Sequence, residues 1–202
     1  IGVLMLGFFM TKESVGVFSL ATQLISRVMI IPETLFTLLA PKAASCKEGE
    51  VELIAQSSRF AALICGTLLV LIYFLSESFI NLIYPSLFSE AVLVIKIMTI
   101  GVFLRCVSKI FVPYFLGMNL PGIASLSVFF GVVVNIFTYI LLVPRYGLAG
   151  AAIGTVLGHT LSSFLLYMFF IKRTGMTFKE CLLFNDNDWS LVVEKMRIFL
   201  RR

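Results

Sequence analysis

The fold is decided by residues 123–171, which read IASLSVFFGVVVNIFTYILLVPRYGLAGAAIGTVLGHTLSSFLLYMFFI. Two apolar runs, 123–143 and 148–171, flank the short sequence Pro144-Arg145-Tyr146-Gly147. Each run has the length of about 20 residues that an α-helix needs to cross ~30 Å of hydrocarbon. Neither run alternates polar and apolar residues as a barrel strand does. The stretch therefore predicts two consecutive transmembrane helices joined by a tight turn.

The rest of the chain has the same character. Of its 202 residues 59% are hydrophobic and 13% are charged, and the mean hydropathy is +1.03. A soluble domain carries about 25% charged residues, and a disordered chain carries even more charge and less apolar surface. The four cysteines are sparse and follow no disulfide framework, which excludes a small disulfide-rich secreted module. The composition predicts an all-α, polytopic helical membrane protein.

Four further apolar segments precede the pair, at residues 1–10, 15–38, 58–75 and 91–112. The first is too short to span a bilayer, and it lacks the basic start and the cleavage site of a signal peptide. We expect it to be the end of a helix that begins upstream, followed by five full spans. The predicted transmembrane region is 1–175, and residues 176–202 form a tail.

The distribution of lysine and arginine predicts the orientation of these spans. The connection 41–59 carries three basic residues and the tail carries seven, whereas the opposite side of the membrane carries only Lys12 and Arg145. Both ends of the chain should therefore be cytoplasmic, and the net charge of +5 reflects this topology and no nucleic-acid partner.

The tail has its own pattern. Residues 177–180 fit a capping box at the start of a short helix. Apolar residues from Trp189 to Leu200 then recur at helical spacing, with basic residues on the other faces. This pattern predicts an amphipathic helix that lies on membrane lipids at the inner surface or packs against cytoplasmic loops.

Arg27 is the sharpest polar feature inside a predicted span, because a central arginine is costly in hydrocarbon. Gln23 lies one turn before it, and Ser19 and Thr34 are expected on the same face. We expect this stripe to line a water-filled cavity. The alternative is that Arg27 pairs with a carboxylate of another helix, a role that Glu33 cannot easily fill at six residues' distance.

Other polar residues at depth are candidates for the same cavity. Arg105 and Lys109 lie one turn apart near the cytoplasmic end of 91–112, where snorkelling accounts for Lys109 more readily than for Arg105. Asn135 lies at mid-depth in 123–143, and it either binds another helix or faces the cavity. The candidate binding residues are therefore Arg27, Gln23, Arg105 and Asn135.

The last span carries small residues at every fourth position, Gly150, Gly154, Gly158 and Ser162, which predicts close packing of a neighbouring helix. His159 lies beside this seam and is either a hydrogen-bonded packing residue or a proton-linked site. With a single histidine, scattered cysteines and no glycine-rich phosphate loop, the sequence predicts no enzyme activity, no metal site and no cofactor.

Two stretches resemble a known family of transporters. One is Gly16-Val17-Phe18-Ser19-Leu20-Ala21, followed by Pro32 and by Leu39-Ala40-Pro41-Lys42. The other is Asn135 followed by the turn LLVPRYGLAGAA at residues 141–152. Both are similar to the C-terminal half of the polysaccharide flippases, which include the O-antigen exporters, in the multidrug/oligosaccharidyl-lipid/polysaccharide superfamily. The resemblance covers residues 1–175.

The resemblance implies a fold of two six-helix lobes that rock around a central cavity, as in multidrug and toxic-compound exporters. This chain would be the C-terminal lobe with its first helix truncated, and the N-terminal lobe would be its partner. The implied substrate is an undecaprenyl-diphosphate-linked oligosaccharide, flipped across the bacterial inner membrane for O-antigen and lipopolysaccharide synthesis. The implied role of Arg27, and more weakly of Arg105, is to bind the diphosphate.

Two alternatives remain open at this point. A drug or metabolite antiporter of the same superfamily would favour carboxylates in its cavity, whereas these spans carry arginine at depth. A non-transporting membrane fragment would need no cavity at all.

Overall fold

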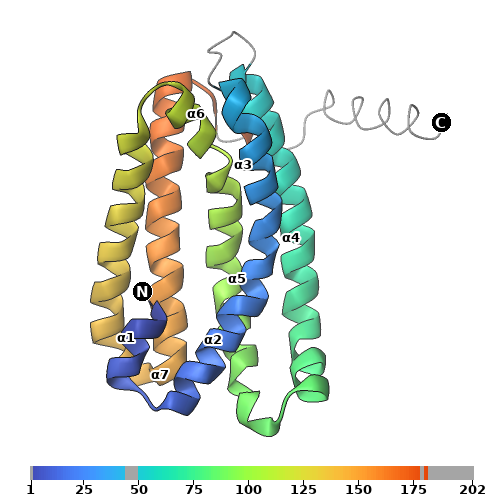
Figure 1. The fold of residues 1–202 in the computed structure, drawn as a ribbon, viewed down its shortest axis with the longest axis vertical. Coiled ribbons are helices and arrows are strands. Elements are labelled where there is room, and N and C mark those ends of the chain that lie inside the picture. Colours follow the sequence, from blue (N-terminus) through green and yellow to red (C-terminus); the bar gives the residue numbers. More distant parts are fainter. Residues whose placement is uncertain (1, 44–49, 178–179, 182–202) are drawn as a thin grey trace, which may run out of the picture.

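The computed structural model describes residues 2–43, 50–177 and 180–181. Their secondary structure is helical throughout, and the helices form an elongated bundle (Figure 1). In chain order the elements are α1 (Gly2–Phe9), α2 (Lys12–Ser26), the 3₁₀ turn η1 (Arg27–Met29), α3 (Ile30–Ala43), α4 (Glu50–Ile83), the 3₁₀ turn η2 (Ser86–Phe88), α5 (Glu90–Lys109), α6 (Val112–Gly117) and α7 (Pro121–Thr174).

Four helical segments are long and apolar enough to cross a membrane: Lys12–Pro41, Val51–Ile83, Ser86–Gly117 and Pro121–Thr174. The last has 54 residues, more than a single bilayer can hold. Gly147 divides it, since its φ of 55° and ψ of −129° are accessible to glycine and strained for other residues. The chain reverses there, and α7 consists of two antiparallel arms, yellow and orange in Figure 1. One expected span, 123–143 or 148–171, lies in each arm.

Two other segments are interrupted without reversing. The 3₁₀ turn η1 separates α2 from α3, and Ile110 and Phe111 separate α5 from α6. The sequence placed the end of a span at Pro113, but this residue stands in the first turn of α6. Proline is tolerated there because the first N–H groups of a helix have no intrahelical partner. The apolar helical segment continues to Gly117, and Arg105 therefore lies deeper inside it than the sequence indicated.

Helix α5 occupies the middle of the bundle and packs against α2, α4 and α7 (Figure 1). Its approach to the second arm of α7 is close, because a Cβ atom added to Gly101 would lie 3.0 Å from Cα of Val156. Most residues of the larger buried cluster lie on these helices, among them Ile95, Met98 and Val102. The α5–α7 contact forms the centre of the bundle, and the other helices pack around it.

The glycine seam predicted from the sequence is confirmed, and its partner is the first arm of α7. A Cβ atom on Gly158 would lie 2.7 Å from the carbonyl oxygen of Gly131, and one on Gly154 would lie 2.7 Å from the Tyr139 ring. No real Cβ atom fits at such distances. The two arms of α7 therefore touch backbone to backbone, which brings the polar residues on both arms together.

Ion pairs join the helices at both ends of α5. Lys109 Nζ lies 2.8 Å from a Glu33 carboxylate oxygen of α3, and Lys96 Nζ lies 3.1 Å from Glu77 of α4. Lys109, for which the sequence suggested snorkelling, and Lys96 thus bind carboxylates of neighbouring helices.

The start of the tail is held by α4. The Ser58 hydroxyl donates to the Cys181 carbonyl oxygen at 2.6 Å, and the buried Arg59 guanidinium donates to the Glu180 carbonyl oxygen and to Glu52. The Glu180 side chain accepts from the backbone N–H of Thr177 at 2.7 Å, as a capping box requires, and this bond lowers the pKa of Glu180. The amphipathic helix predicted after Trp189 lies outside the described residues.

Candidate functional site

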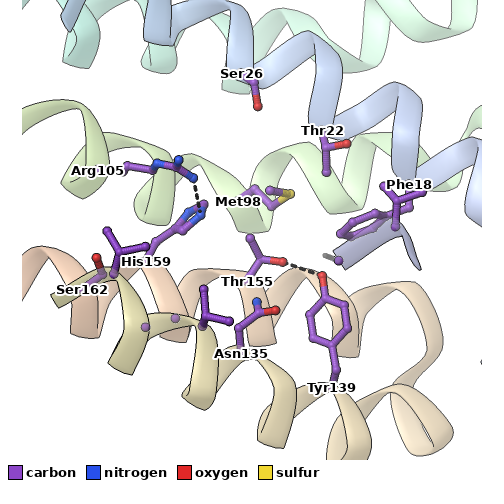
Figure 2. A pocket seen from close by; sticks show the side chains of 16 residues that line it. Phe18, Thr22, Ser26, Met98, Arg105, Asn135, Tyr139, Thr155, His159 and Ser162 are labelled. Carbon is purple, nitrogen blue, oxygen red and sulfur yellow. Dashed lines mark hydrogen bonds between the residues drawn. The ribbon is translucent and has the colours of Figure 1, made fainter. Parts of the chain in front are cut away.

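A cavity of about 460 Å³ lies between α1, α2, α5 and both arms of α7 (Figure 2). Its size is within the range of roughly 300–1,000 Å³ typical of small-molecule sites. The polar side chains on its wall include Thr22, Ser26, Arg105, Asn135, His159 and Ser162. Tyr139 and Thr155 also line it, and Met98 of α5 lies between the two polar ends (Figure 2).

One end of the cavity is cationic. Nη1 of Arg105 lies 2.9 Å from Nε2 of His159, which joins α5 to the second arm of α7 (Figure 2). A guanidinium has only donors, so Nε2 of a neutral imidazole is the acceptor in this bond and the ring proton sits on Nδ1. Within the described residues the Arg105 side chain makes no other hydrogen bond, and it is exposed. Most of its donors are thus open to a ligand.

The other end of the cavity is neutral and rich in hydroxyl and amide groups. The Tyr139 hydroxyl lies 2.7 Å from Oγ1 of Thr155, and this Oγ1 donates to the Ala151 carbonyl oxygen at 2.9 Å. Since a threonine hydroxyl has one proton, Tyr139 is the donor to Thr155 and its own oxygen remains an acceptor. The Asn135 side chain lies beside this pair, on the same arm as Tyr139 (Figure 2). This end can both donate to and accept from a neutral polar ligand.

The charge of the cavity is positive. No aspartate or glutamate is among the described residues that line it. The carboxylates of Glu33, Glu52 and Glu77 form ion pairs with basic residues elsewhere in the bundle. The charge of Arg105 is thus left without a carboxylate partner in the described part of the chain, and it attracts an anion.

The four candidate residues from the sequence fall into two pairs. Arg105 and Asn135 line the cavity, at its cationic and neutral ends respectively. Gln23 and Arg27 are exposed and are not among its lining residues, although Ser26 is. Among the described residues the Arg27 side chain makes neither a hydrogen bond nor an ion pair. The expectation that Arg27 lines the cavity is therefore not met, and the alternative, an ion pair with a carboxylate of another helix, is not formed among the described residues either.

The cavity face of α2 carries Phe18, Thr22 and Ser26, and Arg27 lies one residue further along, about 100° around the helix. The 3₁₀ turn η1 then separates this part of the predicted stripe from Thr34. A 3₁₀ helix has 3.0 residues per turn and an α-helix has 3.6, so a stripe drawn across η1 does not keep one face. Thr34 lies beyond the turn, and its hydroxyl donates a hydrogen bond to the Ile30 carbonyl oxygen at 2.8 Å. The stripe predicted from Ser19 to Thr34 assumed a continuous α-helix, and the break separates its two ends.

Sequence reasoning missed His159 as the partner of Arg105, and it missed Tyr139 and Thr155 as cavity residues. A signal for them was present. Thr155, His159 and Ser162 follow each other at four and three residues, which places them on one helix face. The glycine seam runs beside this face, and the sequence alone therefore left His159 open as a packing residue or a proton-linked site, without indicating Arg105 as its partner.

Comparison with known proteins yields two relatives. Over 187 residues the chain is 24% identical to the probable low-salt glycan biosynthesis flippase Agl15 of Haloferax volcanii. The aligned region covers 86% of this chain and 40% of that protein. Over 134 residues it is 27% identical to the uncharacterized membrane protein MJ1068 of Methanocaldococcus jannaschii, covering 66% of this chain and 25% of that protein. No family model and no solved structure matches the chain.

These likenesses agree with the fold. The chain is a multi-pass helical membrane protein, with long apolar helices of the kind that cross a bilayer and with membrane proteins as relatives. It spans less than half of the length of either curated relative.

Proposed function

We propose that the chain forms one lobe of a membrane transporter that flips a lipid-linked glycan between the two leaflets. The observation that carries the proposal is the cavity inside the helical bundle, which exposes Arg105 and has no carboxylate among its described lining residues. The likeness to a protein named as a glycan biosynthesis flippase supports the glycan as substrate class. A lipid-linked glycan joins its sugar to its lipid through phosphate, and the cationic end suits that group.

The two ends of the cavity would bind different parts of the lipid-linked glycan. The phosphate linkage would lie against Arg105, whose planar fork binds two phosphate oxygens at once. The first sugar would lie against Asn135, Tyr139 and Thr155, whose amide and hydroxyl groups complement sugar hydroxyls. The lipid tail would stay in the bilayer, because a cavity of only about 460 Å³ has no room for a long lipid chain beside the head group.

The finer features of the proposal come from the sequence resemblance. They are an undecaprenyl-diphosphate carrier, an O-antigen product destined for lipopolysaccharide, and a bacterial inner membrane with both chain ends in the cytoplasm. They also include a two-lobe fold in which an N-terminal lobe completes the pathway. The relative named as a flippase is archaeal, so the proposal for this chain is firmest at the level of a polyprenyl phosphate-linked glycan.

The competing candidate, a drug or metabolite antiporter for cations, is less well supported. Such a cavity needs a carboxylate to bind a cation, and every acidic side chain with an ion pair described above lies outside the cavity. The Arg105–His159 contact would repel a cationic substrate.

The test uses the intact parent transporter in a strain that lacks its own flippase. Arg105→Ala should reduce surface glycan at least tenfold at equal membrane abundance, since the group that binds the anion is removed. Arg105→Lys should restore part of the level, because a point charge replaces a planar fork. Lys96→Gln, which removes an equal charge from the Glu77 ion pair outside the cavity, is the matched control. Normal surface glycan with Arg105→Ala would refute the anion site.

A further inference from the structure

His159 lies beside the proposed anion site, and its protonation can change when an anion binds. We propose that His159 is a proton-binding site coupled to the anion, so that the arriving anion brings one proton onto Nε2 of His159. This inference rests on the proposed function, because it needs an anion at Arg105. It adds that transport of the anion is linked to proton uptake by the same cavity.

The geometry of the empty cavity keeps His159 neutral. Nε2 lies 2.9 Å from Nη1 of Arg105 and accepts its hydrogen. A proton on Nε2 would turn this atom into a second donor facing the first, with two positive charges in contact. The Arg105–His159 bond and a protonated His159 therefore exclude each other.

The remaining surroundings of His159 hold no group that would compensate an imidazolium. The cavity presents Gly2 and Val3 from α1, Thr22 and Ser26 from α2, and Asn135 and Tyr139 from the first arm of α7. On its own helix His159 has Thr155 and Ser162 as polar neighbours. Lys109, one turn beyond Arg105, already pairs with Glu33, and neither residue lines the cavity.

The hydrogen on the other ring nitrogen, Nδ1, has no acceptor among the described residues. This nitrogen of His159 is buried. A buried donor without a partner raises the free energy of the empty cavity, since the group has lost its water.

An anion resolves the conflict between the two side chains. A phosphate oxygen placed between them accepts from the guanidinium fork of Arg105 and from a protonated Nε2 of His159. The proton comes from bulk water, which reaches the cavity at the exposed Arg105. One hydrogen bond is exchanged for two charge-assisted ones, and the site gains the anion and a single proton together, with no covalent bond made or broken.

The chain contains one histidine, which makes a direct measurement possible. The 202-residue chain is labelled with ¹⁵N-histidine and placed in lipid nanodiscs, with inorganic pyrophosphate as the probe at constant ionic strength. Without pyrophosphate the imidazole should be the neutral Nδ1–H tautomer. Saturating pyrophosphate should raise the pH midpoint of its titration by at least one unit. By linkage, pyrophosphate affinity should then fall at least tenfold as the pH rises through this interval.

Two variants separate the coupling from the binding. His159→Gln keeps a side-chain oxygen that can accept from Arg105 but has nothing to titrate, so its pyrophosphate affinity should be lower and independent of pH. Lys96→Gln should keep the pH dependence of the wild type, since its charge lies outside the cavity.

The outcomes distinguish this inference from the proposed function. If pyrophosphate binds and the imidazole midpoint does not move, the proton coupling is wrong and the anion site stands. If pyrophosphate does not bind at any pH, both fail. If the empty protein shows the Nε2–H tautomer, the Arg105–His159 bond is wrongly assigned and the coupling falls with it.

Discussion

The arginines on two sides of the bundle have different surroundings. On one side α5 and the two arms of α7 pack closely at Gly101, Gly131 and Gly158, and this packing brings Arg105 and His159 together. On the other side α2 and α3 are separated by η1, and Arg27 at that break is exposed without a described partner. Both arginines lie within long apolar segments, yet only the tightly packed side forms a site around its arginine.

The difference teaches that an intramembrane arginine acquires a site from its neighbours. Depth in a span sets the cost of the charge, which is high for Arg27 and Arg105 alike. Direction around the helix and the approach of a second helix decide what the charge can bind. Close glycine contacts bring His159 within reach of Arg105 and so convert a costly residue into a binding group.

The largest effect should come from filling the seam on the packed side. In Gly158→Leu the new side chain would collide with the Gly131 backbone, since even a Cβ atom would lie 2.7 Å from its carbonyl oxygen. We expect loss of most folded protein, measured as the monodisperse fraction in detergent. Gly16→Leu on α2 is the matched control, because nothing lies within 4 Å of its Cβ position. Equal yields for both variants would remove the distinction between the two sides.

The next effect compares the two arginines directly. Arg105→Ala should weaken pyrophosphate binding at least tenfold, whereas Arg27→Ala should change it less than about twofold, since only Arg105 lines the cavity. Isothermal titration of the two variants at equal ionic strength measures this. A larger loss for Arg27→Ala would restore the order of importance that the sequence predicted and would place the anion outside the cavity described here.

A smaller effect concerns the neutral end of the cavity. Tyr139→Phe removes the hydroxyl that donates to Thr155 and leaves the buried ring in place. The free energy of unfolding should fall by about 1 kcal/mol, the usual contribution of a single hydrogen bond. Thermal unfolding in detergent would show a decrease of a few degrees. Thr22→Val, a cavity residue of α2 whose hydroxyl bonds within its own helix, should have a smaller effect.

The smallest expected effect concerns the Thr177–Glu180 hydrogen bond at the start of the tail, which belongs to neither of the two sides compared above. The Thr177 amide lowers the pKa of Glu180, so this bond stabilises the folded state above the ordinary glutamate pKa of about 4.3 and is lost as the pH falls below it. Hydrogen exchange at the Thr177 amide should therefore accelerate at acid pH beyond its intrinsic trend. In Glu180→Gln the acceleration should be absent.

Much of the fold was predictable from the order of residues. Apolar runs of bilayer length gave the helices, and Pro144 to Gly147 gave the reversal between the last two, because a positive φ at Gly147 is cheap only for glycine. The spacing of Gly150, Gly154 and Gly158 predicted a close helix contact, which the structure confirms. Pro113 was misjudged as an end because a proline also begins a helix.

The site was predictable only in part. Arg105 and Asn135 were found because polar side chains in an apolar run are conspicuous whatever their direction. Their correct ranking was not accessible, since it depends on which face of each helix meets the cavity, and Arg27 lies one residue beyond Ser26 on a different face of α2. His159 was visible as a residue, but its contact with Arg105 joins positions 54 residues apart.

The sequence by itself determined that this chain is helical, that it is a membrane protein and that its apolar spans carry positive charge. Those properties follow from transfer free energies, which add up residue by residue along the chain. Only the tertiary structure decided which charge meets which partner. The Arg105–His159 bond and the neutral end at Tyr139 exist because α5 and the two arms of α7 approach at glycine contacts, and such distances are set by packing in three dimensions.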